Sequence, residues 1–176
     1  GIDRAASKIE APRRQRNLSQ AREHALALVR KHPDDARALF LASRAESDAV
    51  FLFPPDDKEN RKLAALSSLE YARGMAKTGG ESADSSAQLA WALGTTTHLQ
   101  PRMDRAKQAT ETMKTIQRAL SLNPEQRTAL AALAILHLRL ATLPWIAKVM
   151  ASGAPDGALE GAEEAATRAA KVRPSM

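Results

Sequence analysis

Helical stretches that end in the same kind of stop constrain this chain more than any other feature of its sequence. The octapeptide QRALSLNP ends at Pro124, and the segments ALALVRKHP and TRAAKVRP close in the same way. Proline disfavours the α conformation in the residue before it, so each segment ends a helix. With a diglycine break included, the stops lie about 44 to 50 residues apart, at Pro33, Gly79/Gly80, Pro124 and Pro174. This period predicts stacked helix pairs, because one pair cannot bury its apolar stripe alone.

Between these stops, apolar residues recur at three- and four-residue steps, the spacing of one helix face. Acidic residues mark where helices begin, since Asp34 or Asp35, and Asp56 or Asp57, can accept hydrogen bonds from free backbone amides. Aromatic residues make up only 3% of the chain, while alanine and leucine are abundant, which favours helix. The expected helices cover residues 17–33, 34–53, 58–77, 84–99, 103–122, 125–140 and 158–172.

The short connections between these segments make neighbouring helices antiparallel. We therefore predict an all-α fold, a superhelical stack of about three antiparallel helix hairpins preceded by a leading helix. Residues 1–16 are charged, contain Pro12 and lack a steady apolar stripe, so we expect a flexible or frayed N-terminal arm there. Residues 17–176 are expected to form a single helical domain.

The stop pattern resembles the tetratricopeptide repeat, in which small residues stand at fixed distances from a closing proline. Ala119 and Ile116 match the small and the larger apolar positions before Pro124, and Leu93-Gly94 matches the pair expected in the first helix of a hairpin. Small residues let the two helices of a hairpin approach closely. The standard repeat has about 34 residues, so the resemblance implies longer-than-standard repeats here.

From Trp91 onward the chain resembles, more narrowly, the regulator-of-microtubule-dynamics proteins and their bacterial relatives. The resemblance rests on the elements ALG, RALSLNP and LPW and on the segment from AP to AEEAA, although Ala134 and Leu136 replace the usual glycine and tryptophan. These are packing motifs, so they imply a fold more than an activity. Bacterial members look exported. The chain opens on Gly1, so either a leader was cleaved or the sequence was trimmed, and this start says little about export. We expect an exported or periplasmic bacterial protein.

No arrangement of residues in the sequence predicts catalysis. Cysteine is absent, the four histidines are far apart, and the paired acidic residues fit helix capping better than acid–base chemistry. We therefore predict no enzyme, no cofactor and no metal site. No apolar run reaches the roughly 20 residues of a membrane span. The net charge is +6, but the basic residues are scattered without interleaved aromatic residues, so we expect no specific nucleic-acid binding.

In stacked hairpins the first helices line the concave surface, and the repeat register gives their outward positions. Aromatic rings beside arginine and polar side chains suit an extended peptide or an acidic ligand. We predict a noncatalytic helical-repeat scaffold that binds a protein or peptide partner in this groove. The candidate groove residues are Arg37, Phe40, Arg44, Asp48, Gln88, Trp91, Thr95, His98 and Arg139.

Three alternatives stay open from the sequence. The groove residues could instead pack against the terminal helix as core. The chain could also be a periplasmic accessory or small-ligand-binding helical protein of the type associated with TRAP transporters. Phe51 and Phe53 either anchor a helix end in the core or form an exposed lip for a partner. His137 stands at an aromatic packing position, which favours a structural role, and Trp145 either pins a kink or belongs to an interface.

Overall fold

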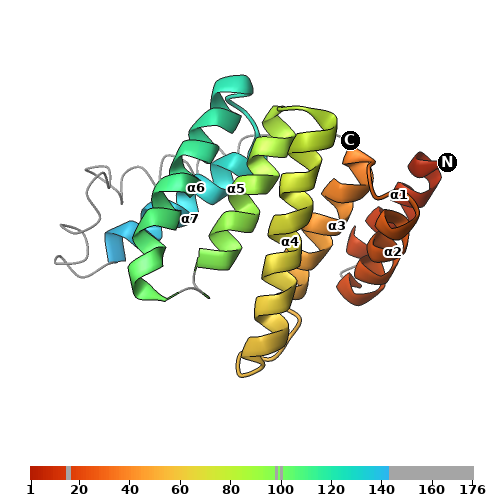
Figure 1. The fold of residues 1–176 in the computed structure, drawn as a ribbon, viewed down its shortest axis with the longest axis horizontal. Helices are drawn as coiled ribbons and strands as arrows, with labels where there is room; N and C mark the ends of the chain where they lie inside the picture. Colours follow the sequence, from red (N-terminus) through yellow and green to blue (C-terminus); the bar gives the residue numbers. More distant parts are fainter. Residues whose placement is uncertain (15–16, 98, 100, 143–176) are drawn as a thin grey trace. The chain divides into compact units, whose positions relative to one another are not determined.

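The computed structural model describes residues 1–14, 17–97, 99 and 101–142, and the described part of the chain consists of helices joined by short turns (Figure 1). The predicted all-α class is thereby confirmed. The chain divides into two compact units, Gly1–Glu81 and Ser82–Met176, where the sequence predicted a single domain. The predicted helix at 158–172, His98 and Trp145 lie outside the described residues.

The first unit contains four helices: α1 (Ile2–Arg14), α2 (Leu18–Lys31), α3 (Ala36–Ala49) and α4 (Lys58–Gly79). Along the chain, α1 packs on α2, α2 packs on α3 and α3 packs on α4, and α1 also touches α3. Local chemistry sets the helix starts as predicted. Asp35 Oδ1 accepts a hydrogen bond from the Ala38 amide at 2.8 Å, and Asp57 Oδ1 accepts one from the Asn60 amide at 3.2 Å.

The predicted N-terminal arm is instead the ordered helix α1. Ala6 and Ile9 are each only 2% exposed and belong to the same apolar core as the buried residues of α2 and α3. The difference has a physical cause. A helix that is charged on most of its surface needs only a narrow apolar contact once two neighbouring helices supply the rest of the core. Such a narrow stripe does not stand out in the sequence.

Small residues bring α3 and α4 close together. The Ser43 hydroxyl donates to the Ser68 carbonyl, and the Ser68 hydroxyl donates to the Ser43 carbonyl, both at 2.8 Å. Both serines are fully buried, and these bonds satisfy their hydroxyl groups in the core. At the other end of the hairpin, a Cβ on Gly79 would lie 2.6 Å from the Ala36 Cβ. A side chain is therefore excluded at Gly79 by the approach of α3.

The second unit contains α5 (Ala83–Thr97), α6 (Arg102–Leu122) and α7 (Arg127–Thr142), with each helix packed on the other two. Ser82 and Ser85 exchange hydrogen bonds between amide and hydroxyl groups at the start of α5. Ile116 and Ala119, which match the repeat positions before Pro124, are fully buried. The observed helix ends thus follow the caps and stops in the sequence to within a few residues.

Candidate partner-binding face

Three ion pairs join α1 to α3 in a constant register. Asp3 pairs with Arg37 at 2.5 Å, Glu10 pairs with Arg44, and Arg13 Nε lies 3.0 Å from Asp48 Oδ2. The paired residues are 34, 34 and 35 positions apart in the sequence. Offsets that agree to within one residue require two helices that run parallel and side by side. We call the surface formed by Asp3, Glu10, Arg13, Arg37, Phe40, Arg44 and Asp48 the α1–α3 face.

The two ends of the α1–α3 face differ in exposure. The Arg37 side chain is 56% exposed and that of Asp3 is 90% exposed, so water and ligands reach this pair. In the middle of the face Arg44 and Glu10 are only 19% and 28% exposed, and at the other end Arg13 and Asp48 are 38% and 23% exposed. The Arg44 guanidinium also lies over the Phe40 ring, 5.0 Å from its centroid, and Phe40 packs on the core of the unit. The open end therefore lies at Arg37.

These pairs change the chemistry expected of the predicted groove. The sequence suggested arginines presented to an acidic ligand, but Arg44 and Asp48 already hold oppositely charged partners from α1. An exposed ion pair contributes only about 0–1 kcal/mol, so a ligand can replace Asp3 at Arg37 at little cost. Displacing Glu10 from the more buried Arg44 costs more, because the desolvated charge must find a new partner.

In the second unit the predicted groove residues have mixed environments, and Arg139 is exposed. Gln88 and Thr95 are buried, and the Thr95 hydroxyl donates to the Trp91 carbonyl at 2.9 Å. Trp91 is half-buried against Ala90 and Ile116. Arg139 donates to the Gly94 carbonyl at 3.3 Å and so links α7 to α5. The repeat register placed these side chains outward, whereas Gln88 and Thr95 are buried and Trp91 packs in a cluster with Leu133 and Leu136 of α7.

A buried charged cluster in the first unit was missed from the sequence. Glu46 is 2% exposed, and Arg22 from α2 donates to both of its carboxylate oxygens at 3.0 and 3.2 Å. The Phe53 ring covers the Arg22 guanidinium at 5.6 Å. Burial raises the pKa of Tyr71 above its ordinary value, and the Glu46 carboxylate raises it further. One signal was available: Glu46 stands on the apolar stripe of Ala42, Ala45 and Ala49.

The Arg22–Glu46 cluster fits a structural role. The bidentate geometry engages both oxygens of the carboxylate with the guanidinium. The raised pKa of Tyr71 keeps its phenol protonated at neutral pH. Within the described ranges, no three acidic or histidine side chains come close enough together to hold a metal ion.

The two phenylalanines of FLFPPDD have different environments. Phe53 is half-buried under Arg22, as expected of an anchor, whereas Phe51 is 65% exposed. Arg61 holds the turn, since its Nε donates to the Val50 carbonyl at 3.0 Å. Phe53 therefore fits the anchor reading, and a partner at the exposed Phe51 stays a prediction.

His137 is half-buried on α7, and burial lowers the pKa of its imidazole below the ordinary value. Its Nδ1 is buried and has no hydrogen-bond partner among the residues that the structure describes. A buried nitrogen without a partner favours the neutral ring, in keeping with the predicted structural position.

Comparison with known proteins finds one family model that matches the chain. It is the model of regulator of microtubule dynamics protein 1-3, and it covers residues 6–176. The match extends well beyond the C-terminal half on which the resemblance was based. A search of curated proteins finds no match. None of the helices in the described part of the chain combines the length and the apolar character that crossing a bilayer requires.

Proposed function

Because the chain belongs to the family of regulator of microtubule dynamics protein 1-3, we propose that it is a noncatalytic helical-repeat scaffold that binds a protein or peptide partner through the α1–α3 face. The observation that carries the proposal is the offset of 34 to 35 residues that all three ion pairs share. Helices α1 and α3 therefore lie parallel and form one surface, which carries the half-buried ring of Phe40 and the exposed side chain of Arg37.

The same offset supports a tetratricopeptide-like architecture for the first unit. Helix α1 begins at Ile2 and α3 begins 34 residues later at Ala36, which equals the standard period of that repeat. In this reading α1 and α2 form the first hairpin, and α3 and α4 form the second. The later first helices, α5 and α7, begin at Ala83 and Arg127 and follow a longer period.

The partner chemistry follows from the open end of the α1–α3 face. A carboxylate on the partner competes with the 90% exposed Asp3 for the N–H groups of the Arg37 guanidinium. An apolar side chain of the partner then lies beside Phe40, three residues along α3, where ring area contributes most of the binding energy. We therefore expect a peptide that combines an acidic residue with a neighbouring apolar one.

A selection from a displayed random-peptide library on the intact chain tests the proposal. We expect enrichment of acidic and apolar residues in adjacent positions. The affinity for the selected peptides should fall at least about tenfold in Arg37→Glu and in Phe40→Ala, because each variant loses one contact at the centre of the interface. Lys114→Glu, an exposed charge change on α6, is the matched control. Peptides that bind equally well to all three variants would exclude this face.

Microtubules are the first protein partner to test, because the matching family is named for regulators of microtubule dynamics. We expect cosedimentation with microtubules that Arg37→Glu weakens and Lys114→Glu does not. A chain of net charge +6 binds anionic surfaces without specificity, so the binding must persist when salt rises from about 0.05 to 0.2 M.

The alternative of a small-ligand-binding accessory protein stays a prediction. A thermal-shift screen with small carboxylic acids tests it on the same sample. Stabilisation that grows with ligand concentration would favour this alternative, since a ligand that binds only the native state raises the unfolding temperature.

A further inference from the structure

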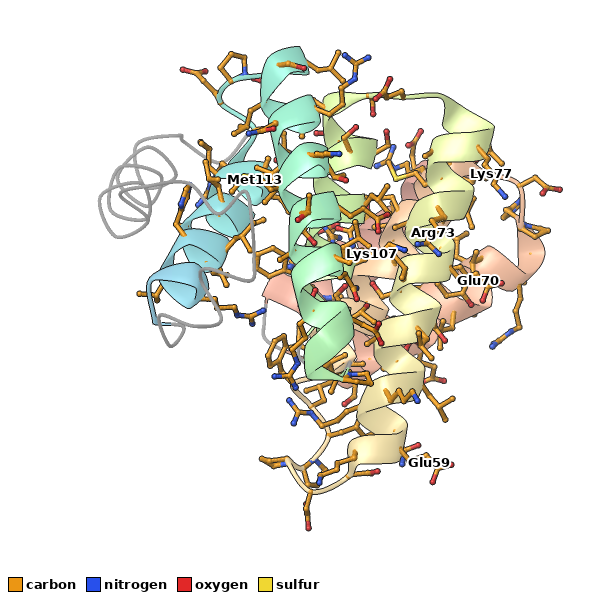
Figure 2. The ribbon with its side chains drawn as sticks, turned by 60° about the vertical axis from the view of Figure 1, so that its left-hand side comes forward. Glu59, Glu70, Arg73, Lys77, Lys107 and Met113 are labelled. Carbon is orange, nitrogen blue, oxygen red and sulfur yellow. The ribbon has the colours of Figure 1, made fainter. Side chains whose placement is uncertain are left out.

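Helix α7 carries a stripe of apolar side chains on its surface. Ile135 is 40% exposed and Leu138 is 52% exposed. An α-helix turns by about 100° per residue, so these two side chains and the half-buried Ala131 and Ala134 lie within about 100° of one another. We call Ala131, Ala134, Ile135 and Leu138 the outer α7 stripe. Figure 2 shows α7 at the edge of the second unit, beside α6.

The opposite side of α7 already packs on the rest of the second unit. Ala129 lies in one apolar cluster with Ala87 of α5 and Ala119 of α6, and Ala132 lies in a neighbouring cluster with residues of the same two helices. Helix α7 is therefore apolar on two sides. A helix that is apolar all round is typically buried, which indicates that a further segment covers the outer α7 stripe.

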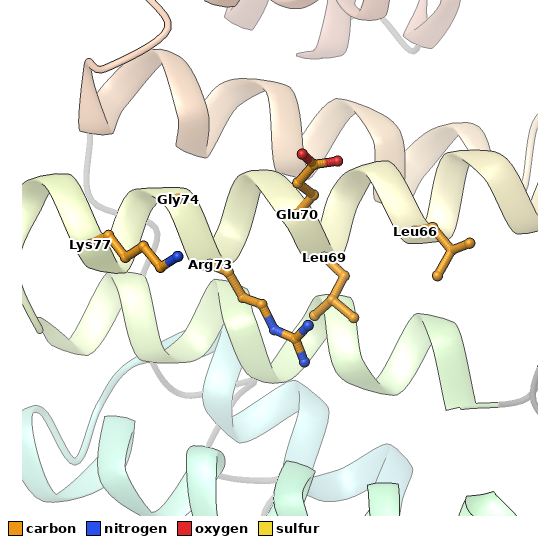
Figure 3. Close-up of a pocket in the computed structure, with 6 residues that line it drawn as sticks. All are labelled: Leu66, Leu69, Glu70, Arg73, Gly74 and Lys77. Atoms are coloured by element: carbon orange, nitrogen blue, oxygen red, sulfur yellow. The ribbon is translucent and has the colours of Figure 1, made fainter.

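The exposed leucines of α4 differ from this stripe, because charged side chains surround them. Leu66 lines a hollow together with Glu70, Arg73 and Lys77, and Figure 3 shows these charged side chains along the helix. Water can solvate such a mixed surface, and single exposed leucines are ordinary. On α7, by contrast, residues 131–138 include no lysine, arginine, aspartate or glutamate. The outer α7 stripe is therefore the apolar surface that most needs a cover.

The chain itself supplies a segment of matching character. The sequence predicts a helix over residues 158–172, which lie outside the described residues. At about 100° per residue, every alanine, leucine and valine of this segment falls within an arc of about 160°. These apolar residues are Ala158, Leu159, Ala162, Ala165, Ala166, Ala169, Ala170 and Val172. The opposite side holds Glu160, Glu163, Glu164, Thr167, Arg168 and Lys171.

We propose that residues 158–172 fold back and bind the outer α7 stripe with this apolar arc, so that the charged side faces water. The segment belongs to the same compact unit as α7, Ser82–Met176, and the family model continues through residue 176. About 15 residues connect Thr142 to the segment. Since an extended chain spans about 3.3 Å per residue, this connection is long enough for the chain to reverse its direction.

Side-chain size and connectivity favour this occupant over a second copy of the chain. The outer α7 stripe projects the large side chains of Ile135 and Leu138, whereas the centre of the apolar arc holds Ala162 and Ala169. Small residues let two helices approach closely, and large ones fill the groove between them. A second copy bound at α7 would leave the apolar arc of residues 158–172 uncovered. Binding within the chain covers both apolar surfaces at once and has the higher effective concentration.

Cysteine reactivity in the full-length chain tests the binding, since the chain contains no cysteine. The rate of each single-cysteine variant with a thiol reagent is divided by its rate in urea. We expect Ala162→Cys and Ala169→Cys to react at least about tenfold more slowly than Glu160→Cys and Lys171→Cys, because only the first two are covered. Equal normalised rates on the two sides would overturn the proposal. Protection that appears only at high protein concentration would also overturn it, in favour of a second copy.

A charge placed on α7 tests where the segment binds. Adding Leu138→Asp to Ala162→Cys should raise the normalised rate at least about tenfold, because a carboxylate does not pack against the apolar arc. Leu63→Asp is the matched control, since Leu63 is 56% exposed on α4 in the first unit. Circular dichroism must show equal helix content in both variants, and Leu138→Ser replaces Leu138→Asp if the latter unfolds. A rate that the change at position 138 leaves unaltered would refute binding at α7. Neither test bears on the α1–α3 face, which lies in the first unit.

Discussion

Replacing Arg22 with methionine removes both hydrogen bonds that the structure places on the Glu46 carboxylate. Glu46 stays behind with a side chain that is only 3% exposed, so water cannot take the place of the guanidinium. Breaking a buried ion pair from one side costs about 3–5 kcal/mol. The lost contact between Arg22 and the Phe53 ring adds about 0.5–1 kcal/mol. Domains of this size unfold with about 5–15 kcal/mol, so Arg22→Met removes a large share of the stability.

The reverse change should be milder, and this asymmetry tests the reasoning. Glu46→Met leaves an arginine whose side chain is 34% exposed and can remain hydrated, so we expect a loss of about 1–2 kcal/mol. In the double variant two apolar side chains of similar volume replace the pair, which buried pairs often tolerate. Adding Glu46→Met to Arg22→Met should therefore recover at least about 1–2 kcal/mol.

Urea unfolding followed by circular dichroism at neutral pH measures all four chains of this cycle. Unchanged dependence on urea across the set would show that the unfolded states are comparable. A large cost of leaving Glu46 unpaired is refuted if Arg22→Met costs less than about 1 kcal/mol, or if the second substitution lowers the stability further. Either outcome would mean that Glu46 reaches water or another donor once Arg22 is gone.

Two further predictions concern the helix hairpin and the histidine. Gly79→Ala places a Cβ 2.6 Å from the Ala36 Cβ and should lower the free energy of unfolding by about 1–3 kcal/mol. Lys77→Ala, two residues earlier at an exposed position, is the control. Equal losses of stability for the two variants in urea unfolding would contradict the close approach of the helices. Burial lowers the pKa of His137 in the folded chain, so the unfolded chain binds a proton there more readily than the folded chain does. The free energy of unfolding is therefore unaffected by this histidine above about pH 6.5 and decreases as the pH falls below that value. His137→Leu should flatten the decline in stability between pH 7.5 and 5, and a decline as steep as that of the wild type would show that other groups cause it.

Helix boundaries were predictable because the groups that set them are neighbours in the sequence. Asp35 and Asp57 cap helices through amides three residues ahead, and Pro33 and Pro124 disfavour helix in the residues before them. Gly80 adopts a φ of 76°, a left-handed conformation that glycine adopts without strain, which explains why a diglycine ends α4. The burial of Ile116 and Ala119 also followed from their spacing before the stop.

The sequence alone determined where helices begin and end, since capping and proline sterics act within one turn. Only the tertiary structure decided what each helix face meets. The ion pairs between α1 and α3 join residues about 34 positions apart. The helix α1 could therefore be recognised only from the tertiary structure, which shows α3 packed beside it. The burial of Glu46 likewise depends on Arg22 from another helix, and the enclosure of Gln88 depends on packing around α5. Contacts between distant segments depend on how stripes of similar composition pair. Local periodicity shows that such a stripe exists but not which partner covers it.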